Sequence, residues 1–364
     1  MRRNPNAAIV DFAPKRHCLW GRPLRAHLFV ATTEFPRFVE NCHMRWRFPL
    51  GTTVANLQAG SGDRPGTDNL KNRRHTLESF IAAGVNGLTL GTQYALISIG
   101  FTLIFSIMGV VNFAHGGFYI LGGYIAYSLS GTLGLPFVAA VVIATLVTGI
   151  LGYVVQRLFV EKYVSDHLAT MLITLGIYQI MTTGVTYFYG AEPVDFHFPI
   201  TGALRGPGFY IPYPNIVVTA VCVAAIVGVY YLVFRTRYGI ALRAMADDAP
   251  VARAQGIPPA RMFPMAFGIA TALAGLTGAL VTPMLALEPT GGESVLGKAF
   301  IVVILGGLGS VTGAMIAAFI VGIIEAYSSV YLGGSQGALA LFVLVVLILL
   351  VRPQGLLGAV ARKA

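Results

Sequence analysis

The sequence predicts an all-α fold: a polytopic integral membrane helix bundle of about eight transmembrane helices, one of them broken by glycines near 306-310. Three observations support this prediction. Hydrophobic residues make up 55% of the 364-residue chain and charged residues only 11%, which leaves too little polar surface for a soluble globule. Residues 79–156 contain no Asp, Glu, Lys or Arg. A short polar segment at 234–262 separates two long apolar runs, as a loop between spans would.

Residues 1–78 are expected to form a poorly ordered basic extension ahead of a transmembrane domain at 79–360. They hold 13 Lys and Arg against 6 Asp and Glu, a net charge of +7, whereas residues 79–364 hold 12 against 9, a net charge of +3. The extension shows neither helical nor strand periodicity. A basic flank beside a first span typically meets lipid headgroups, so we expect membrane lipid rather than nucleic acid as its partner.

No metal site is expected in the extension. His17-Cys18 and Cys42-His43 are adjacent pairs that lack the usual two-to-four-residue spacing of zinc ligands.

Spans follow from the apolar runs, at about 20 residues per crossing. The sixth is rich in small residues, including Gly275 and Gly278, that let helix backbones approach closely, so it should pack inside the bundle. In the seventh, irregular backbone at Gly306–Ser310 would persist only where protein or water covers it. The expected spans are residues 80–107, 113–131, 136–156, 168–191, 213–234, 262–287, 299–324 and 326–351.

The polar segment at 234–262 is expected to face the cytoplasm and to contain a short separate helix. Its five arginines set the orientation by the bias of Lys and Arg toward cytoplasmic loops. Asp247 or Asp248 can cap the helix, and Pro250 is tolerated in its first turn. Gly256 suits the residue just past its end, and Pro258-Pro259 prevent continuation.

Arg352 and the basic residues after it place the C-terminal tail in the cytoplasm as well. Three simple crossings from residue 261 would leave the tail outside, so we expect the glycine break to separate a partial crossing from a full one. Counting backward puts residue 79 outside, although the basic extension prefers the inside. The side of the N-terminus therefore stays open.

No catalytic constellation is present, and we expect neither an enzyme nor a bound cofactor. Residues 292–299 nearly match a phosphate-binding loop, but Ala299 lacks the hydroxyl that would meet magnesium, and no strand precedes it. His115 and Glu325 are the candidates for an intramembrane proton relay. Two isolated groups favour instead a histidine satisfied by a carbonyl and a glutamate near an interface. What remains is a pathway protein without its own energy source.

Two motifs, Asn86-Gly87-Leu88-Thr89-Leu90-Gly91 and Val111-Asn112-Phe113-Ala114-His115-Gly116, resemble those of the branched-chain amino-acid ABC transporter permeases of the first-subunit type. The likeness covers about residues 84–358 and includes Ala246-Asp247-Asp248 and the segment Leu305–Ser310. The chain departs from the family at Gly117, where an acidic residue is usual, and at Pro250, where a helix former is usual.

The resemblance implies a permease subunit of an ATP-driven importer for branched-chain amino acids in a bacterial inner membrane. Its implied partners are a second related permease, two cytoplasmic ATPase subunits that bind the ATP, and a periplasmic or extracellular amino-acid-binding protein. The residues implied to couple to the ATPase are Asp247, Asp248, Ala252, Gly256 and Ile257. The candidate residues of the translocation pathway are Asn112, Phe113, His115, Gly306, Gly307 and Gly309.

Members of the family usually begin just before the first span, which suggests that residues 1 to about 76 come from an upstream start assignment. Three other functions stay open at this point. The first is a permease for urea or short amides, whose sequences look similar. The second is a secondary transporter or channel that needs no ATPase, and the third is a membrane scaffold that moves nothing.

Overall fold

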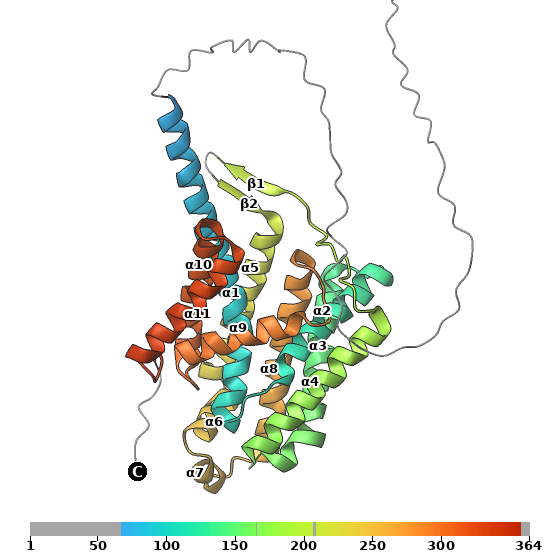
Figure 1. Cartoon of the computed structure of the whole chain (residues 1–364). Helices are drawn as coiled ribbons and strands as arrows, with labels where there is room; N and C mark the ends of the chain where they lie inside the picture. Colours follow the sequence, from blue (N-terminus) through green and yellow to red (C-terminus); the bar gives the residue numbers. More distant parts are fainter. Residues whose placement is uncertain (1–66, 165, 207–208, 358–364) are drawn as a thin grey trace, which may run out of the picture. The chain divides into compact units, whose positions relative to one another are not determined.

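The computed structural model describes residues 67–164, 166–206 and 209–357, which all lie within one compact unit of packed helices (Figure 1). The predicted all-α membrane bundle is confirmed. Most of the predicted extension, and with it the suggested upstream start, falls in residues 1–66. These lie outside the described residues.

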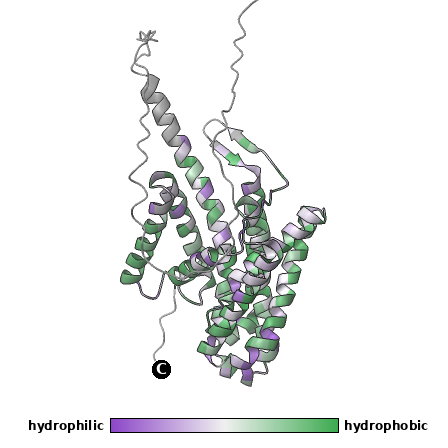
Figure 2. Ribbon diagram, turned by 45° about the vertical axis from the view of Figure 1, so that its right-hand side comes forward, coloured by the Kyte–Doolittle hydropathy of each residue, from purple (hydrophilic) through white to green (hydrophobic). Residues whose placement is uncertain are grey.

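Eleven α-helices and one short antiparallel hairpin make up the described residues, and hydrophobic residues run along the long helices (Figure 2). The α-helices are α1 (Thr67–Met108), α2 (Ala114–Tyr127), α3 (Phe137–Val155), α4 (His167–Tyr189), α5 (Tyr213–Arg235), α6 (Arg237–Asp247), α7 (Ala249–Ala254), α8 (Pro259–Val281), α9 (Gly291–Gly306), α10 (Val311–Tyr331) and α11 (Gly334–Val351). The π-helical segments are η1 (Ser128–Thr132) and η2 (Gln156–Val160), and the 3₁₀ segments are η3 (Glu161–Tyr163) and η4 (Thr282–Met284). The hairpin pairs β1 (Ala203–Gly206) with β2 (Phe209–Pro212).

The N-terminal helix α1 begins at Thr67, whereas the sequence placed the start of the ordered domain at residue 79. The membrane-length part of this helix is Glu78–Met108, close to the predicted first span. Hydropathy detects only the apolar part of a helix, while the backbone hydrogen-bond ladder can continue through polar residues of good helix propensity such as Lys71 and Arg73. The predicted boundary therefore marked the membrane edge rather than the helix start.

Six helices among the described residues are long and apolar enough to cross a membrane, fewer than the predicted number of about eight. With 14 and 16 residues, α2 and α9 are shorter than the roughly 17–25 residues of a simple crossing, while α11 with 18 lies at the lower end of that range. Length and composition alone thus select six helices, and the shorter apolar helices account for the difference from the predicted number. The six are Glu78–Met108, Phe137–Tyr163, His167–Tyr189, Tyr213–Arg235, Pro259–Met284 and Val311–Tyr331.

The predicted glycine break is confirmed, and we call residues 307–310 the glycine turn. α9 ends at Gly306, and α10 begins after Ser310, whose Oγ accepts a hydrogen bond from the Gly313 N–H at 3.1 Å. Gly307 and Gly309 have φ angles of +99° and +87°, which side chains other than glycine rarely adopt. The sequence assigned the break correctly but not the helices beside it.

The boundary predicted between the last two spans, at residues 324–326, is wrong. α10 continues to Tyr331, and the chain turns at Leu332 and Gly333 before α11. The apolar run from Ala326 to Tyr331 contains nothing that would end a helix, so the first stop signal is Gly333, whose φ is +86°.

The two ends of the bundle can be assigned from contacts. Phe80 of α1 accepts a hydrogen bond from Tyr327 at 3.1 Å, and Ser79 and Pro212 line one cavity. The hairpin thus lies at the same end as the start of the first span, opposite α6 and α7 (Figure 1). α10 ends near Phe80 at the hairpin end, and α11 leads the chain back to the α6–α7 end, where the Leu356 N–H bonds the Leu305 carbonyl. Lys and Arg bias makes that end cytoplasmic and puts residue 79 outside.

The small residues of α8 let it pack inside the bundle, as predicted, with 78% of its most apolar window buried. Gly275 faces Thr148 of α3, and Gly278 lies against the backbone of Tyr119 of α2. A Cβ at either glycine would overlap these neighbours.

Gly275→Leu should lower the stability of the folded protein by about 1–3 kcal/mol or more, because the added side chain overpacks the α3–α8 contact. Gly228→Leu is the matched control, since a Cβ at Gly228 in α5 meets nothing within 4 Å. Thermal unfolding of the detergent-solubilised protein should fall for Gly275→Leu only. Equal melting temperatures for both variants would contradict this packing.

Candidate functional site

The polar segment folds into two cytoplasmic helices rather than the single short helix predicted. Thr236 starts α6, with its hydroxyl oxygen accepting a hydrogen bond from the Gly239 N–H at 3.1 Å. Asp248 starts α7, with its carboxylate accepting from the Val251 N–H at 3.0 Å. The predicted cap at Asp248 is thus confirmed, while the earlier cap at Thr236 went unnoticed. Thr236 also donates to the Leu232 carbonyl at 2.6 Å.

The predicted end of the short helix is also confirmed. Gly256 lies just past α7 with a φ of +83°, a conformation that glycine adopts without strain. Pro258 precedes α8, which begins at Pro259. Two of the predicted coupling residues do not face outward. Ala252 is buried, with 3% of its surface exposed, and Ile257 packs against the core.

We call the exposed outer side of α7 and its flanks the docking surface. Asp247, Asp248 and Gly256 are exposed there, as is Val251, an apolar side chain with 54% of its surface exposed. Ala252 and Ile257 hold this surface against the rest of the chain. Only part of the predicted coupling set is therefore available to a partner.

Two aromatic side chains, Phe234 and Tyr238, hold α6 in place. The Arg243 guanidinium lies 5.0 Å from the centroid of the Phe234 ring, a distance suited to a cation–π contact. Tyr238 donates a hydrogen bond to the Met262 carbonyl at 3.3 Å, which links α6 to α8. Burial raises the pKa of the Tyr238 phenol, so it stays a neutral donor.

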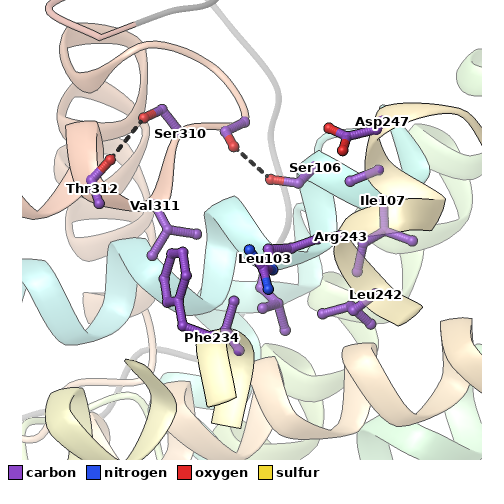
Figure 3. A pocket seen from close by; sticks show the side chains of 13 residues that line it. Leu103, Ser106, Ile107, Phe234, Leu242, Arg243, Asp247, Ser310, Val311 and Thr312 are labelled. Atoms are coloured by element: carbon purple, nitrogen blue, oxygen red, sulfur yellow. Dashed lines mark hydrogen bonds between the residues drawn. The ribbon is translucent and has the colours of Figure 1, made fainter. Parts of the chain in front are cut away.

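A cavity of about 370 Å³ lies between the end of α1, α6 and the glycine turn (Figure 3). Arg243 and Asp247 of α6 line it together with Ser310. Ser106 of α1 donates a hydrogen bond to the Gly309 carbonyl at 3.0 Å. The glycine turn and the cytoplasmic helices thus share one space, although they are far apart in the sequence.

Asn112, Phe113 and His115 gather at the start of α2. The Asn112 carboxamide oxygen accepts a hydrogen bond from the Ala114 N–H at 3.0 Å, and the Phe113 N–H donates to the Thr174 hydroxyl at 3.2 Å. His115 is fully buried, with Nε2 3.1 Å from the Ile97 carbonyl oxygen. Both polar side chains are thus engaged with backbone groups in this structure.

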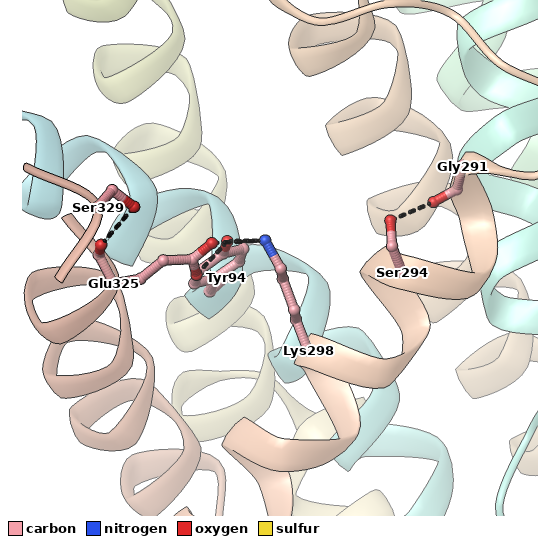
Figure 4. Close-up of polar contacts among 6 residues, drawn as sticks. All are labelled: Tyr94, Gly291, Ser294, Lys298, Glu325 and Ser329. Atoms are coloured by element: carbon pink, nitrogen blue, oxygen red, sulfur yellow. Dashed lines mark hydrogen bonds and ion pairs between the residues drawn. The ribbon is translucent and has the colours of Figure 1, made fainter. Parts of the chain in front are cut away.

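Sequence reasoning missed a cluster of charged and polar groups inside the bundle (Figure 4). Lys298 of α9 forms an ion pair with Glu325 of α10, with 2.6 Å between Nζ and Oε1. Tyr94 of α1 accepts a hydrogen bond from Lys298 at 3.0 Å and donates one to Glu325 at 2.7 Å. The available signal was two lone, opposite charges in consecutive apolar segments.

The positions of Lys298 and Glu325 correct two sequence-based interpretations. Residues 292–299 lie within the continuous helix α9, so the resemblance to a phosphate-binding loop has no structural counterpart. Glu325 does not lie alone near an interface but is paired across two helices with Lys298.

Comparisons with known proteins agree with this architecture. A family profile described as "Branched-chain amino acid transport system / permease component" matches residues 84–352. The chain is 31% identical over 292 residues to the high-affinity branched-chain amino acid transport system permease protein BraD of Pseudomonas aeruginosa, covering 75% of this chain and 94% of that relative.

Two further relatives are from Escherichia coli. The permease protein LivH of the corresponding system is 31% identical over 300 residues, covering 77% of this chain and 96% of LivH. The permease protein LivM is 27% identical over 305 residues, covering 74% of this chain and 68% of LivM.

Asp248→Ala should destabilise α7 by about 0.5–2 kcal/mol, because the variant loses the carboxylate that caps the helix. Hydrogen exchange of the 249–256 backbone amides should become correspondingly faster. Asp247→Ala is the matched control, since this neighbouring exposed carboxylate ends α6 and does not cap α7. Unchanged exchange in the Asp248 variant would rule out the cap.

Proposed function

The chain belongs to the branched-chain amino acid transport permease family, and from this premise we propose that it is the membrane-spanning subunit of an ATP-driven importer of branched-chain amino acids. The family profile matches most of the described bundle, and the relatives BraD and LivH are covered almost end to end. Such permeases move a substrate and catalyse no reaction of their own. The chain itself is a multi-pass membrane protein, which we assign to the bacterial inner membrane.

A second permease subunit is the partner that the comparisons favour, since LivH and LivM are both permease proteins of one transport system and both resemble this chain. We further assign it two cytoplasmic ATPase subunits and an extracytoplasmic amino-acid-binding protein. ATP would be bound by those ATPases, and the continuous helix across residues 292–299 supports this division of labour.

The single observation that carries the ATPase assignment is the capped, exposed helix α7 at the cytoplasmic end. Asp248 caps the start of this short helix, and Gly256 with the proline pair fixes its end. A loop that only connects two spans would not require such a defined helix. Exposed Val251 adds an apolar contact point on a surface that also carries the charges of Asp247, Asp248 and Arg253. Charge-bearing rims around an apolar centre are typical of protein interfaces.

We propose alternating access driven through α6 and the glycine turn. When the ATPases close, they displace the segment 235–261. The glycine turn responds to this displacement because it lines the same cavity as α6. The Ser106 hydrogen bond to Gly309 connects the turn to the end of α1. The turn can repack because its two positive-φ glycines are compatible with several conformations.

The predicted pathway residues are retained as part of the proposal, in altered roles. Gly306, Gly307 and Gly309 form the movable end of the path at the cytoplasmic side. Asn112 and His115 hold the α1–α2 connection beside it through their backbone contacts. Phe113 is half-buried at the same connection.

The permease for urea or short amides is less well supported, because the relatives that match over most of their length carry branched-chain amino acids by name. A secondary transporter is disfavoured for the same reason. Uptake assays of the assembled transporter with leucine, urea and acetamide would separate these functions. ATP-independent uptake would favour the secondary transporter.

Gly256→Arg should abolish copurification of the ATPases, because it strains the positive-φ position and adds a bulky cation beside the docking surface. Gly256→Asn is the matched control, since asparagine tolerates positive φ and is uncharged. Pull-downs from detergent-solubilised membranes, followed by identification of the copurifying proteins, compare the two variants with the parent chain. Copurification of ATPases with the Arg variant at the parent level would place the ATPase contact elsewhere.

A further inference from the structure

A second, larger cavity is lined by the partly exposed ion pair of Lys298 and Glu325. It has a volume of about 780 Å³, within the roughly 300–1,000 Å³ range of small-molecule sites, and lies between α9, α10 and α11. Its charged lining consists of the ion pair Lys298–Glu325 and two further carboxylates, Glu288 and Glu293, while Ile301, Leu341 and Phe342 form an apolar wall. We call this space the ion-pair cavity.

The ion pair lies between the middle of the bundle and its outer end, since Glu325 is six residues, or about 9 Å, before the end of α10. Tyr94, which contacts both charges, is the 17th of the 31 residues of the first span. At 1.5 Å per residue it lies about 24 Å from one end of that span and about 21 Å from the other. Charged side chains within membrane-spanning segments typically mark a substrate or ion pathway.

The two charges cannot face lipid directly. In the single chain the side chain of Lys298 is 37% exposed and that of Glu325 is 19% exposed, both toward the cavity that they line. An ionised side chain in hydrocarbon costs at least about 2.5–3.5 kcal/mol. The open side of the ion-pair cavity must therefore meet water or another subunit, which fits a transport path better than a lipid-facing groove.

We propose that the ion-pair cavity recognises the zwitterionic head group of the transported amino acid, an inference that rests on the proposed function. Lys298 binds the α-carboxylate, and Glu325, held by Tyr94, binds the α-ammonium. Leu341 and Phe342 receive the aliphatic side chain. When no substrate is present, the two protein charges neutralise each other at 2.6 Å.

The binding of a zwitterion at the ion pair is electrostatically favourable. The ion pair and the zwitterion each have zero net charge, so binding replaces one ion pair by two and leaves unchanged the total charge of the cavity, which Glu288 and Glu293 also line. An uncharged urea or amide would separate the pair and compensate neither charge, which costs several kcal/mol per ion in a dry site. The cavity therefore favours amino acids over the neutral alternatives.

The test uses the Lys298→Gln/Glu325→Gln double variant, which removes both charges together and leaves side chains able to hydrogen bond. The transporter is purified with its copurifying subunits, reconstituted into proteoliposomes and supplied with binding protein, ATP and radiolabelled leucine. The expected result is normal assembly with at least a tenfold lower uptake rate. Uptake at the parent rate would overturn the proposal, because a merely structural pair is replaceable.

A charge-reversed variant, Lys298→Glu/Glu325→Lys, addresses the case in which the glutamine variant fails to assemble. Its ion pair persists, so it should assemble, but its polarity is inverted and leucine uptake should again fall at least tenfold. Parent-level uptake by this variant would overturn the proposal. The matched control is Lys162→Glu, which reverses an exposed charge outside the cavity and should leave uptake unchanged.

This experiment distinguishes a failure of the proposed transport function from a failure of head-group recognition by Lys298 and Glu325. If the parent transporter shows no ATP-dependent leucine uptake, the proposed function is wrong, and head-group recognition falls with it. If the parent transports leucine and both cavity variants do so equally well, only the assignment of Lys298 and Glu325 is wrong.

Discussion

Hydrocarbon offers no hydrogen bonds to a peptide backbone, and this constraint governs where the bundle can be irregular. The glycine turn leaves carbonyl groups at the end of α9 without partners in their own helix. The C-terminal tail supplies the donors: the Leu356 N–H bonds the Leu305 carbonyl at 2.8 Å, and the Leu357 N–H bonds that of Gly306 at 3.1 Å. The tail can come this close because Gly355 packs against Gly307 without a side chain. The break in the helix therefore depends on residues some 50 positions later in the chain.

That dependence explains which parts of the fold could be predicted. Hydropathy placed α3, α4, α5 and α8 within a few residues, because each is bounded by charge, proline or glycine that hydropathy can register. It failed at α10 and α11, where apolar residues continue through the predicted boundary and only Gly333 ends the helix. It also could not show that α2 is short and buried against α8 and α4, which is a tertiary fact that no local pattern contains.

The candidate sites divide in the same way. The cap of α7 could be predicted because Asp248, Pro250 and Gly256 act within a few residues of one another. Inward-facing Ala252 could not be told from outward-facing Val251 without knowing what lies behind the helix. The pairing of Lys298 with Glu325 was harder still, because three helices must pack before these side chains and Tyr94 meet. A single charged residue in an apolar segment predicts that a partner of opposite charge exists, but it does not identify that partner.

α9 connects the two ends of the proposed mechanism. Its last residue, Gly306, leads into the turn that shares a cavity with α6, and Lys298 lies eight residues earlier on the same uninterrupted helix, about 12 Å away at 1.5 Å per residue. A helix of this length moves as a rigid rod, because its backbone hydrogen bonds resist bending. Displacement of the glycine turn by the cytoplasmic helices must therefore also move Lys298 relative to Glu325, which lies on the far side of the break in α10. A break placed between the two charged residues is what allows a cytoplasmic motion to change the distance between them.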